Sequence, residues 1–569
     1  MPTPSPTVCP LPIRTSRFPQ VPEALRAALT LVSLALAAST LAPRAMAQPV
    51  AGVGDDAIPI PHGGFRFLVG GLWNDYRAVF APGDGKRELF ATLGTDRFGT
   101  TQLPQLQAAE SSIRALSGDS RFSLSLGALE AQGEVRQSIA PFTIDYGVTR
   151  RLSLRVLVPY VESRDATQFI LNRAGRGANV GRNPAFVNAA SRATNGAVLT
   201  QIETARAALV AQLTRCVNTT ATGCDAIRAN VAGAQGLVNR ALQTSVQLRT
   251  VYGNAERAGS PVVPLVNSTQ HAGVLRTIDA LRTDFGAYGI TSIAASAAPA
   301  AATTVLGPAS MTTVASDTSF GVGYERLGDT RRAGIGDVDL TATFLVFDTF
   351  QADQVRRLLT PTRGIRSNVS MGWRFGTAGA DRTEDAFDVP IGEGANALLV
   401  RSTTDLMFNR RAWVSATVRA VHPIADRVNV LLPDRDEATA FLPVGSATAA
   451  RALGNRLEVE LAPRYAVGQF FGVSAAYLWR HWGADRFDVA NAEGTALEAS
   501  RWKTPSRSLS AAAVGVTFST LASYTRGRSR FPAEVIYTHT TPLSGSGGVV
   551  PAVSSDRLEL RVYTGFPRR

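Results

Sequence analysis

The chain has 569 residues and a formal net charge of +13, and only 18% of its residues are charged, so it is long enough for one large folded domain. The basic balance does not indicate a nucleic-acid partner, because the arginines are spread over strands and loops and form no cluster. They are interpreted as lumen and surface charges, with affinity for anionic lipid headgroups as a weaker alternative. No segment after the N-terminal region has about 18 consecutive apolar residues, so a chain of this kind would enter a membrane only as a closed barrel.

The N-terminus has the pattern of a secretory signal peptide over residues 1–47. Arg14, Arg17 and Arg26 precede an apolar stretch at 27–41, and an A-x-A cleavage site ends at Ala47. An N-terminal membrane anchor is the alternative, but the apolar stretch is too short to span a bilayer. We therefore expect export, with cleavage after Ala47.

After cleavage, residues 48–62 are expected to form a periplasmic leader, and residues 63–163 to hold three barrel strands. The clearest pattern is 142–160, where apolar and polar side chains alternate on both sides of Thr149-Arg150. Side chains of a strand point to opposite faces in turn, so this stretch predicts two strands joined by a tight turn. A further strand is expected at 64–76, followed by a long polar and Gly-rich segment at 81–120.

The alternation stops at 164–333, which we interpret as an insertion in one loop. This segment is Ala-rich with helical spacing of its apolar residues, and it contains Cys216 and Cys224. In an exported chain two such cysteines are expected to form a disulfide. A metal-binding pair is the alternative, but no other Cys and no nearby His supports it. The sequence thus predicts a helical hairpin with a disulfide at its tip.

The alternation of apolar and polar residues resumes over 334–569. This region is expected to form nine more strands of about ten residues, which makes about twelve strands in all. Most charges fall on one face of each strand, and a lipid-facing Arg or Lys at the bilayer midplane costs about 2–4 kcal/mol. The connections also fall into two alternating sets. One set is short (149–150, 409–411 and 468–470) apart from two longer members at 348–366 and 521–532, and the other set is uniformly long, with its last member at 543–556. A soluble sandwich explains the strands but not this asymmetry. We therefore predict an all-β fold, an antiparallel up-and-down transmembrane β-barrel of about twelve strands with a large α-helical extracellular loop insertion.

Two stretches resemble a known family. Residues 146–161 (YGVTRRLSLRVLVPYV) and 334–344 (GIGDVDLTATF) look like the outer-membrane barrels named for the meta-pathway of phenol degradation, which are distantly similar to long-chain fatty-acid transporters. The resemblance covers about 122–161 and 334–566, and it implies a monomeric barrel linked to uptake of hydrophobic, often aromatic, compounds. The helical insertion departs from the family's pattern. Phe566, near the C-terminus, is the residue expected to serve the barrel-assembly machinery.

The predicted site consists of charged residues on the inward-facing parity of the strands. They are expected either to line a permeation path or to fill a narrow lumen with salt bridges. The lumen-lining candidates are Asp145, Arg155, Asp337, Asp339, Arg374, Arg401, Asp405, Arg419, Glu458, Glu460, Arg464, Arg480, Glu534, Glu559 and Arg561.

Catalysis is not expected, because the chain has only five His and no G-x-S-x-G motif. No metal and no cofactor is expected either. The leading hypothesis is a bacterial outer-membrane barrel that admits a small hydrophobic or aromatic solute by diffusion. The first alternative is a barrel anchor that presents its helical loop for adhesion or binding, and the weakest is an outer-membrane enzyme. The expected partners are outer-membrane lipid and lipopolysaccharide, the barrel-assembly machinery and the solute, with the chain as a monomer.

Overall fold

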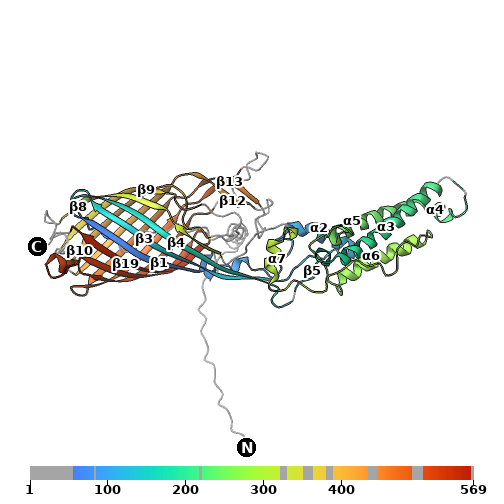
Figure 1. The fold of residues 1–569 in the computed structure, drawn as a ribbon, viewed down its shortest axis with the longest axis horizontal. Helices are drawn as coiled ribbons and strands as arrows, with labels where there is room; N and C mark the ends of the chain where they lie inside the picture. Colours follow the sequence, from blue (N-terminus) through green and yellow to red (C-terminus); the bar gives the residue numbers. More distant parts are fainter. Residues whose placement is uncertain are drawn as a thin grey trace, which may run out of the picture.

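The structure is a computed structural model that describes residues 55–81, 85–175, 177–216, 219, 221–320, 330–349, 363–379, 389–409, 411–432, 445–489 and 504–565. The predicted signal peptide and Phe566 lie outside these ranges. A β-barrel forms one half of the molecule, and a helical body projects from one end of it along the long axis (Figure 1). None of the helices in the described ranges is long and apolar enough to cross a membrane.

Twelve antiparallel strands close the barrel, as predicted. Each pairs with its neighbours in chain order, and the last pairs with the first, from Phe65 opposite Thr564 to Phe80 opposite Val550. Closure leaves no free sheet edge, which is the condition for a sheet in a bilayer. The wall strands are β1 (Phe65–Ala81), β3 (Leu129–Gly147), β4 (Leu152–Leu171), β8 (Val338–Asp348), β9 (Gly364–Phe375), β10 (Ala397–Met407), β11 (Ala412–Pro423), β14 (Arg456–Ala466), β15 (Phe471–Trp482), β17 (Arg507–Ser519), β18 (Ala533–Ser546) and β19 (Val550–Thr564).

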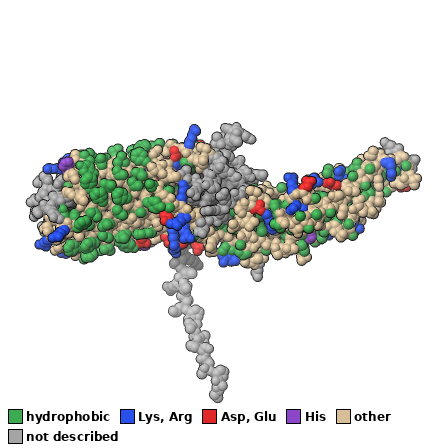
Figure 2. All heavy atoms as spheres, in the orientation of Figure 1, with side chains coloured by type: hydrophobic (Ala, Val, Ile, Leu, Met, Phe, Trp, Pro, Cys, Tyr) green, Lys and Arg blue, Asp and Glu red, His purple; other side chains and the backbone are tan. Residues whose placement is uncertain are grey.

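The outer face of the barrel carries an apolar band. Phe142 on β3 and Leu154 on β4 are 44% and 42% exposed, and their inward neighbours are charged or polar. Toward the helical body the outward side chains become polar, beginning at Ser138 and Glu162. Apolar side chains cover this face of the barrel, and charged ones gather at its two ends (Figure 2). This band matches the height that lipid-facing strands present to a bilayer.

The connections between strands differ at the two ends of the barrel. At one end, called here the turn end, β3 joins β4 through 148–151 and β14 joins β15 through 467–470. The opposite end, called the loop end, carries most of the long connections. The predicted long connection at 543–556 is wrong: β18 and β19 extend to a tight turn in which Gly547 and Gly548 have φ of 84° and 142°, a region that suits glycine.

Shorter elements lie on the loop end, where β2 and β7 extend the barrel sheet and β12, β13 and β16 form a separate three-stranded sheet. Their bounds are β2 (Gly85–Glu88), β7 (Thr330–Ile335), β12 (Asp426–Leu432), β13 (Gly445–Ala452) and β16 (Arg486–Val489). A short helix, α9 (Leu521–Thr525), lies in the turn-end connection between β17 and β18.

The helical body comprises the described residues between 89 and 128 and between 172 and 320, and the hairpin of β3 and β4 carries it. β4 runs to Leu171 and β7 starts at Thr330, so the predicted insertion limit of 164 falls inside the wall strand β4 and that of 333 inside the short strand β7 that pairs with it. The elements are η1 (Ala91–Leu93), η2 (Pro104–Leu106), α2 (Gln107–Ser117), β5 (Val180–Arg182), η3 (Pro184–Phe186), α3 (Ala189–Cys216), α4 (Asp225–Ala229), α5 (Val231–Tyr252), β6 (Val262–Pro264), α6 (Thr269–Gly286), α7 (Ser310–Ser316) and η4 (Thr318–Phe320).

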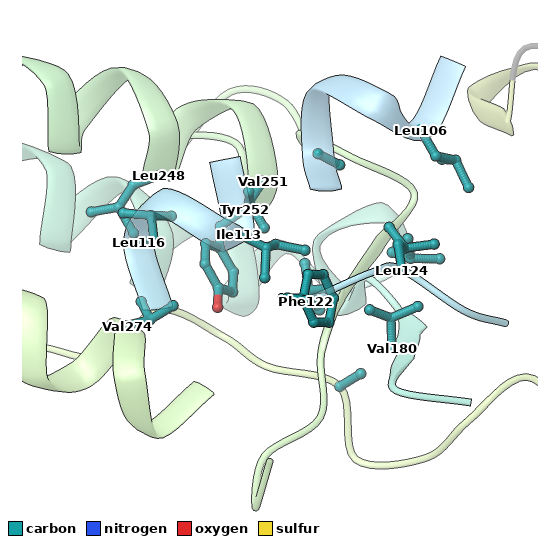
Figure 3. Packing of buried hydrophobic residues seen from close by; sticks show 14 of the residues in the cluster. Leu106, Ile113, Leu116, Phe122, Leu124, Val180, Leu248, Val251, Tyr252 and Val274 are labelled. Atoms are coloured by element: carbon teal, nitrogen blue, oxygen red, sulfur yellow. The ribbon is translucent and has the colours of Figure 1, made fainter. Parts of the chain in front are cut away.

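Helix α2 shows that the body is built from two connections rather than one. The segment 81–120 was expected to be only a long polar loop, but Ile113 and Leu116 of α2 pack with Leu248 and Val274 of α5 and α6 (Figure 3). The spacing of these two apolar residues places them on one face of the helix. The contacts are distant in sequence, so the periodicity of either loop alone did not reveal them.

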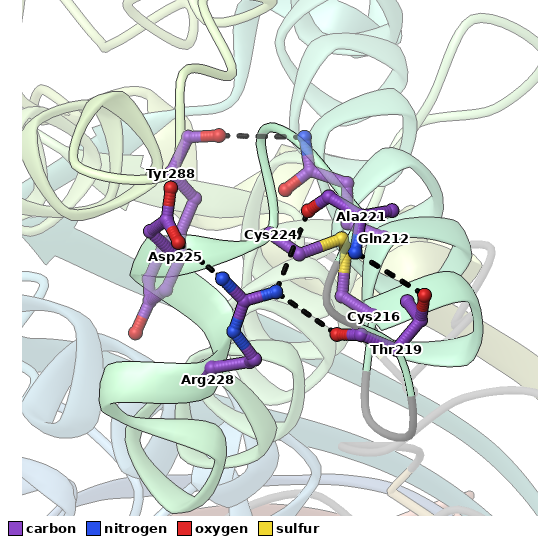
Figure 4. Close-up of a disulfide and its surroundings, with 8 residues drawn as sticks. All are labelled: Gln212, Cys216, Thr219, Ala221, Cys224, Asp225, Arg228 and Tyr288. Carbon is purple, nitrogen blue, oxygen red and sulfur yellow. Dashed lines mark hydrogen bonds and ion pairs between the residues drawn. A yellow bond between two sulfur atoms is a disulfide. The ribbon is translucent and has the colours of Figure 1, made fainter.

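The predicted disulfide between Cys216 and Cys224 is present, with 5.2 Å between the Cα atoms. It joins the end of α3 to the residue before α4 (Figure 4), and α4 lies at the far end of the body (Figure 1). Arg228 crosses the same loop and donates to the carbonyl oxygen of Thr219 at 2.9 Å. The tip is therefore closed by a covalent bond and a side-chain contact.

Candidate functional site: the barrel lumen

The predicted inward-facing charges all lie on the inner face of the barrel or at its loop-end rim. Most are buried, and Arg155, Arg401, Arg464, Arg480 and Glu534 are half-buried. Their opposite-parity neighbours on the same strands form the outer apolar band. Because successive side chains of a strand point to opposite faces, the charged residues face the interior and their apolar neighbours face the lipid.

Ion pairs connect these charges across neighbouring strands. Asp145 contacts both Arg66 and Arg155, and Arg419 contacts both Glu458 and Glu460. A charge in a confined interior is costly unless it is paired, and these networks supply the partners.

The strand pattern did not identify every charge of the lumen. Arg66 lies on the polar parity of the first strand and pairs with Asp145 at 2.7 Å, although it was not among the predicted residues. Arg366 was not among the predicted residues either, and it lies on β9, which begins at Gly364. Arg366 Nη2 contacts Asp405 Oδ2 at 2.8 Å, and both side chains are almost fully buried.

The N-terminal segment 55–60, called here the plug, enters the lumen from the turn end. Asp55 Oδ2 lies 2.7 Å from Arg401 Nη1 and 3.3 Å from Arg419 Nη2, and Asp56 lies 3.3 Å from Arg561. The backbone N–H of Ala57 donates to Asp405 Oδ2 at 3.0 Å. The predicted periplasmic leader 48–62 therefore does not describe this segment, because its acidic pair is drawn to the arginines of the wall.

At the loop end, the connection between β9 and β10 folds over the opening. Its described parts, 376–379 and 389–396, are called here the lid. The carboxylate of Asp337 accepts backbone hydrogen bonds from Ala378 (3.1 Å), Glu393 (2.8 Å) and Gly394 (3.2 Å). Asp337 was predicted to line the lumen. In the structure its carboxylate holds the lid through these three hydrogen bonds, which are called here the latch.

Between plug and lid lies a cavity of about 230 Å³. The side formed by β1, β3 and β4 contains an apolar patch, called here the apolar wall, which consists of Leu68, Leu72, Ile139 and Leu157. The lid residue Ile391 belongs to the same buried cluster as Ile139 and Leu72. The opposite side, from β10, β11 and β14, carries the Arg and Glu networks. The lumen thus has an apolar wall beside one charged network, that of Arg66, Asp145 and Arg155, and further charged networks on the opposite side.

One further polar cluster lies outside the lumen. On the outward side of β18 and β19, His539 Nδ1 lies 2.8 Å from Asp556 Oδ1, and His539 Nε2 lies 3.1 Å from Thr541 Oγ1. The hydroxyl of Tyr537 also donates to Asp556 at 2.6 Å. This arrangement matches the polar rim above the apolar band, where Tyr and His side chains bridge lipid and water.

No protein-family model and no curated protein matches the chain. Among solved structures it is similar to an outer-membrane channel from Pseudomonas putida F1, at 8% identity over 90% of this chain and 100% of that chain, with a TM-score of 0.38. It is also similar to the Ralstonia pickettii toluene transporter (10% identity, 89% and 90% covered, TM-score 0.25). A third is a Pseudomonas aeruginosa FadL homologue (8% identity, 93% and 98% covered, TM-score 0.24).

These solved structures are of the kind that the sequence resembles. The barrel itself is established by its own strand pairing.

Proposed function

We propose that the chain is an outer-membrane channel that admits a small hydrophobic solute through its lumen by diffusion. The loop end would face the outside, since outer-membrane barrels place their long loops there. The observation that carries this proposal is the apolar wall of the cavity, to which three neighbouring strands of the barrel contribute. A lumen filled only with salt bridges has no need of such a wall.

Uptake of a labelled one-ring hydrocarbon by intact Gram-negative cells tests this proposal, because lipopolysaccharide slows the passage of such solutes through the lipid itself. Cells that produce the chain are expected to take up the solute faster than cells without it. Leu157→Gln places a polar amide on the apolar wall and is expected to lower uptake about tenfold, since polar groups disfavour apolar ligands by about 1–3 kcal/mol.

Thr341→Gln is the matched control, because Thr341 lines the same cavity from the polar side. It introduces the same side chain and is expected to leave uptake within about twofold. Equal losses in both variants would indicate simple obstruction, and no uptake above the background of empty cells would reject the channel itself.

The helical body favours a second candidate function, presentation of a binding surface outside the membrane. The body has an apolar core, which continues onto the loop-end parts of β1, β3 and β4, and it projects away from the barrel (Figure 1). Because both loops build that core, a clean deletion replaces 89–128 and 172–328 with short Gly-Ser linkers. Removal of the second segment alone would expose Ile113 and Leu116 of α2.

We expect the double deletion to keep the barrel folded and to retain at least about half of the solute uptake, because the wall strands and their pairing remain. Heat-modifiable mobility on gels reports the folded barrel, and the uptake assay reports the channel. A folded deletion variant that loses all uptake would show that the body is part of the transport route.

A further inference from the structure

Two arginines on the side opposite the apolar wall converge on one oxygen atom. Arg401 of β10 and Arg419 of β11 lie directly opposite each other in the strand register. Like charges in this position repel and destabilise a sheet unless an anion lies between them. The anion is Asp55, whose Oδ2 contacts Arg401 at 2.7 Å and Arg419 at 3.3 Å. The wall therefore contains a carboxylate-binding site that the plug occupies.

The plug contributes a large share of the charge at this site. Arg419 also contacts Glu458 and Glu460. In the described part of the chain, by contrast, Asp55 is the carboxylate that ion-pairs with Arg401, whose other side-chain partner is the Ser370 hydroxyl at 3.2 Å. Withdrawal of the plug would leave Arg401 facing Arg419 without that carboxylate.

The same cavity has an apolar wall across from these arginines. Leu68, Leu72 and Leu157 line it together with Arg401 and Arg419. Its volume is about 230 Å³, and an engineered apolar cavity of about 150 Å³ already holds a benzene molecule. A single aromatic ring fits this space with room for one small substituent.

We propose that the channel selects small aromatic carboxylates, whose ring lies on the apolar wall and whose carboxylate displaces Asp55 from Arg401 and Arg419. This inference rests on the proposed channel function and names its substrate class. Arginine forms a planar, charge-assisted pair with a carboxylate. A neutral ring of the same size would leave Arg401 without a carboxylate partner once the plug is displaced, and sites of that kind discriminate strongly.

Displacement makes Asp55 a competitor of the ligand. A ligand that binds only when the plug has left has its apparent affinity reduced by the fraction of plug-free molecules. Loss of the Asp55 charge should therefore raise the affinity for the aromatic carboxylate, and loss of the Arg401 charge should lower it. If the ion pair were purely structural, both changes would lower the affinity to a similar degree.

Binding of benzoate to the purified full chain in detergent, measured by titration calorimetry, tests this inference. Asp55→Asn is expected to tighten benzoate binding about tenfold, and Arg401→Gln to weaken it about tenfold or more, as loss of a charged hydrogen bond of about 1.5–3 kcal/mol implies. Arg451→Gln is the control, because Arg451 lies in the separate three-stranded sheet and pairs with Asp426 there; it is expected to change binding less than about threefold.

Two further probes define the ligand class. Benzamide has the shape of benzoate without its charge and is expected to bind at least about tenfold more weakly. Acetate carries the charge without the ring and is expected to be weaker to a similar degree. Benzamide binding equal to benzoate, acetate binding equal to benzoate, or parallel losses in Asp55→Asn and Arg401→Gln would each overturn the inference.

The uptake assay distinguishes a wrong substrate class from a wrong channel function. Suppose that a neutral hydrocarbon enters through the chain and Leu157→Gln lowers its uptake, but Arg401→Gln leaves benzoate binding unchanged. The proposed function then stands and the proposed substrate class is wrong. If neither solute binds or enters, the proposed function is itself wrong.

Discussion

Replacement of Asp337 by alanine is expected to open the barrel at its loop end. The carboxylate holds three backbone N–H groups of the lid, from Ala378, Glu393 and Gly394. A hydrogen bond to a charged group contributes about 1.5–3 kcal/mol, so loss of even one changes the ratio of open to closed lid by about tenfold or more. The measurement is single-channel conductance of the purified chain in planar bilayers, where the variant should spend far longer in a conducting state.

Asp337→Asn should be intermediate, because its amide oxygen still accepts hydrogen bonds but carries no charge. Asp426→Ala is the matched control: Asp426 also lies on the loop end, and it pairs with Arg451 in the separate three-stranded sheet. That variant is expected to conduct like the unaltered chain. If Asp337→Ala and Asp426→Ala behave alike, the latch does not control the opening.

The wall strands could be predicted because side chains that face lipid must be apolar, whereas the alternate side chains that face the lumen are often charged or polar. Phe142 and Asp145 on β3 differ in parity, and they lie on opposite faces of the wall. This alternation weakens where the strands extend beyond the lipid. Above the apolar band β18 continues with Ser544, Gly545 and Ser546, and β19 begins with Val550, Pro551 and Ala552, so neither alternates there, and the sequence predicts a connection at 543–556.

The plug, the lid and the composite helical body could not be predicted in the same way, because none of them depends on a repeat. Asp55 reaches Arg401 across 346 positions of the chain, and the role of Asp337 depends on backbone N–H groups that have no sequence signature. Charge alternation showed which residues face inward. It did not show which carboxylate meets which guanidinium, since that choice is made by strand register and by the path of the plug.

Replacement of Asp405 by alanine is expected to be the most destabilising single change in the lumen. Asp405 Oδ2 contacts Arg366 Nη2 at 2.8 Å, and the two side chains are 0% and 1% exposed. Asp405 also accepts from Ser415 Oγ at 2.7 Å and from the backbone of Ala57 in the plug at 3.0 Å. Removing one partner of a buried ion pair typically costs about 3–5 kcal/mol, and here the same change also loosens the plug.

Urea unfolding in lipid vesicles, followed by tryptophan fluorescence, measures this cost, with Thr403→Ala as the control at a buried position of the same strand. The double variant Arg366→Leu/Asp405→Leu separates the two parts of the effect. It removes both charges, so it should recover most of the lost free energy of unfolding, but it cannot restore the acceptor for Ala57. We therefore expect a barrel that is close to normal in stability and yet more permeable than the unaltered chain. A double variant as unstable as Asp405→Ala would mean that the pair itself, and not the stranded charge of Arg366, stabilises the wall.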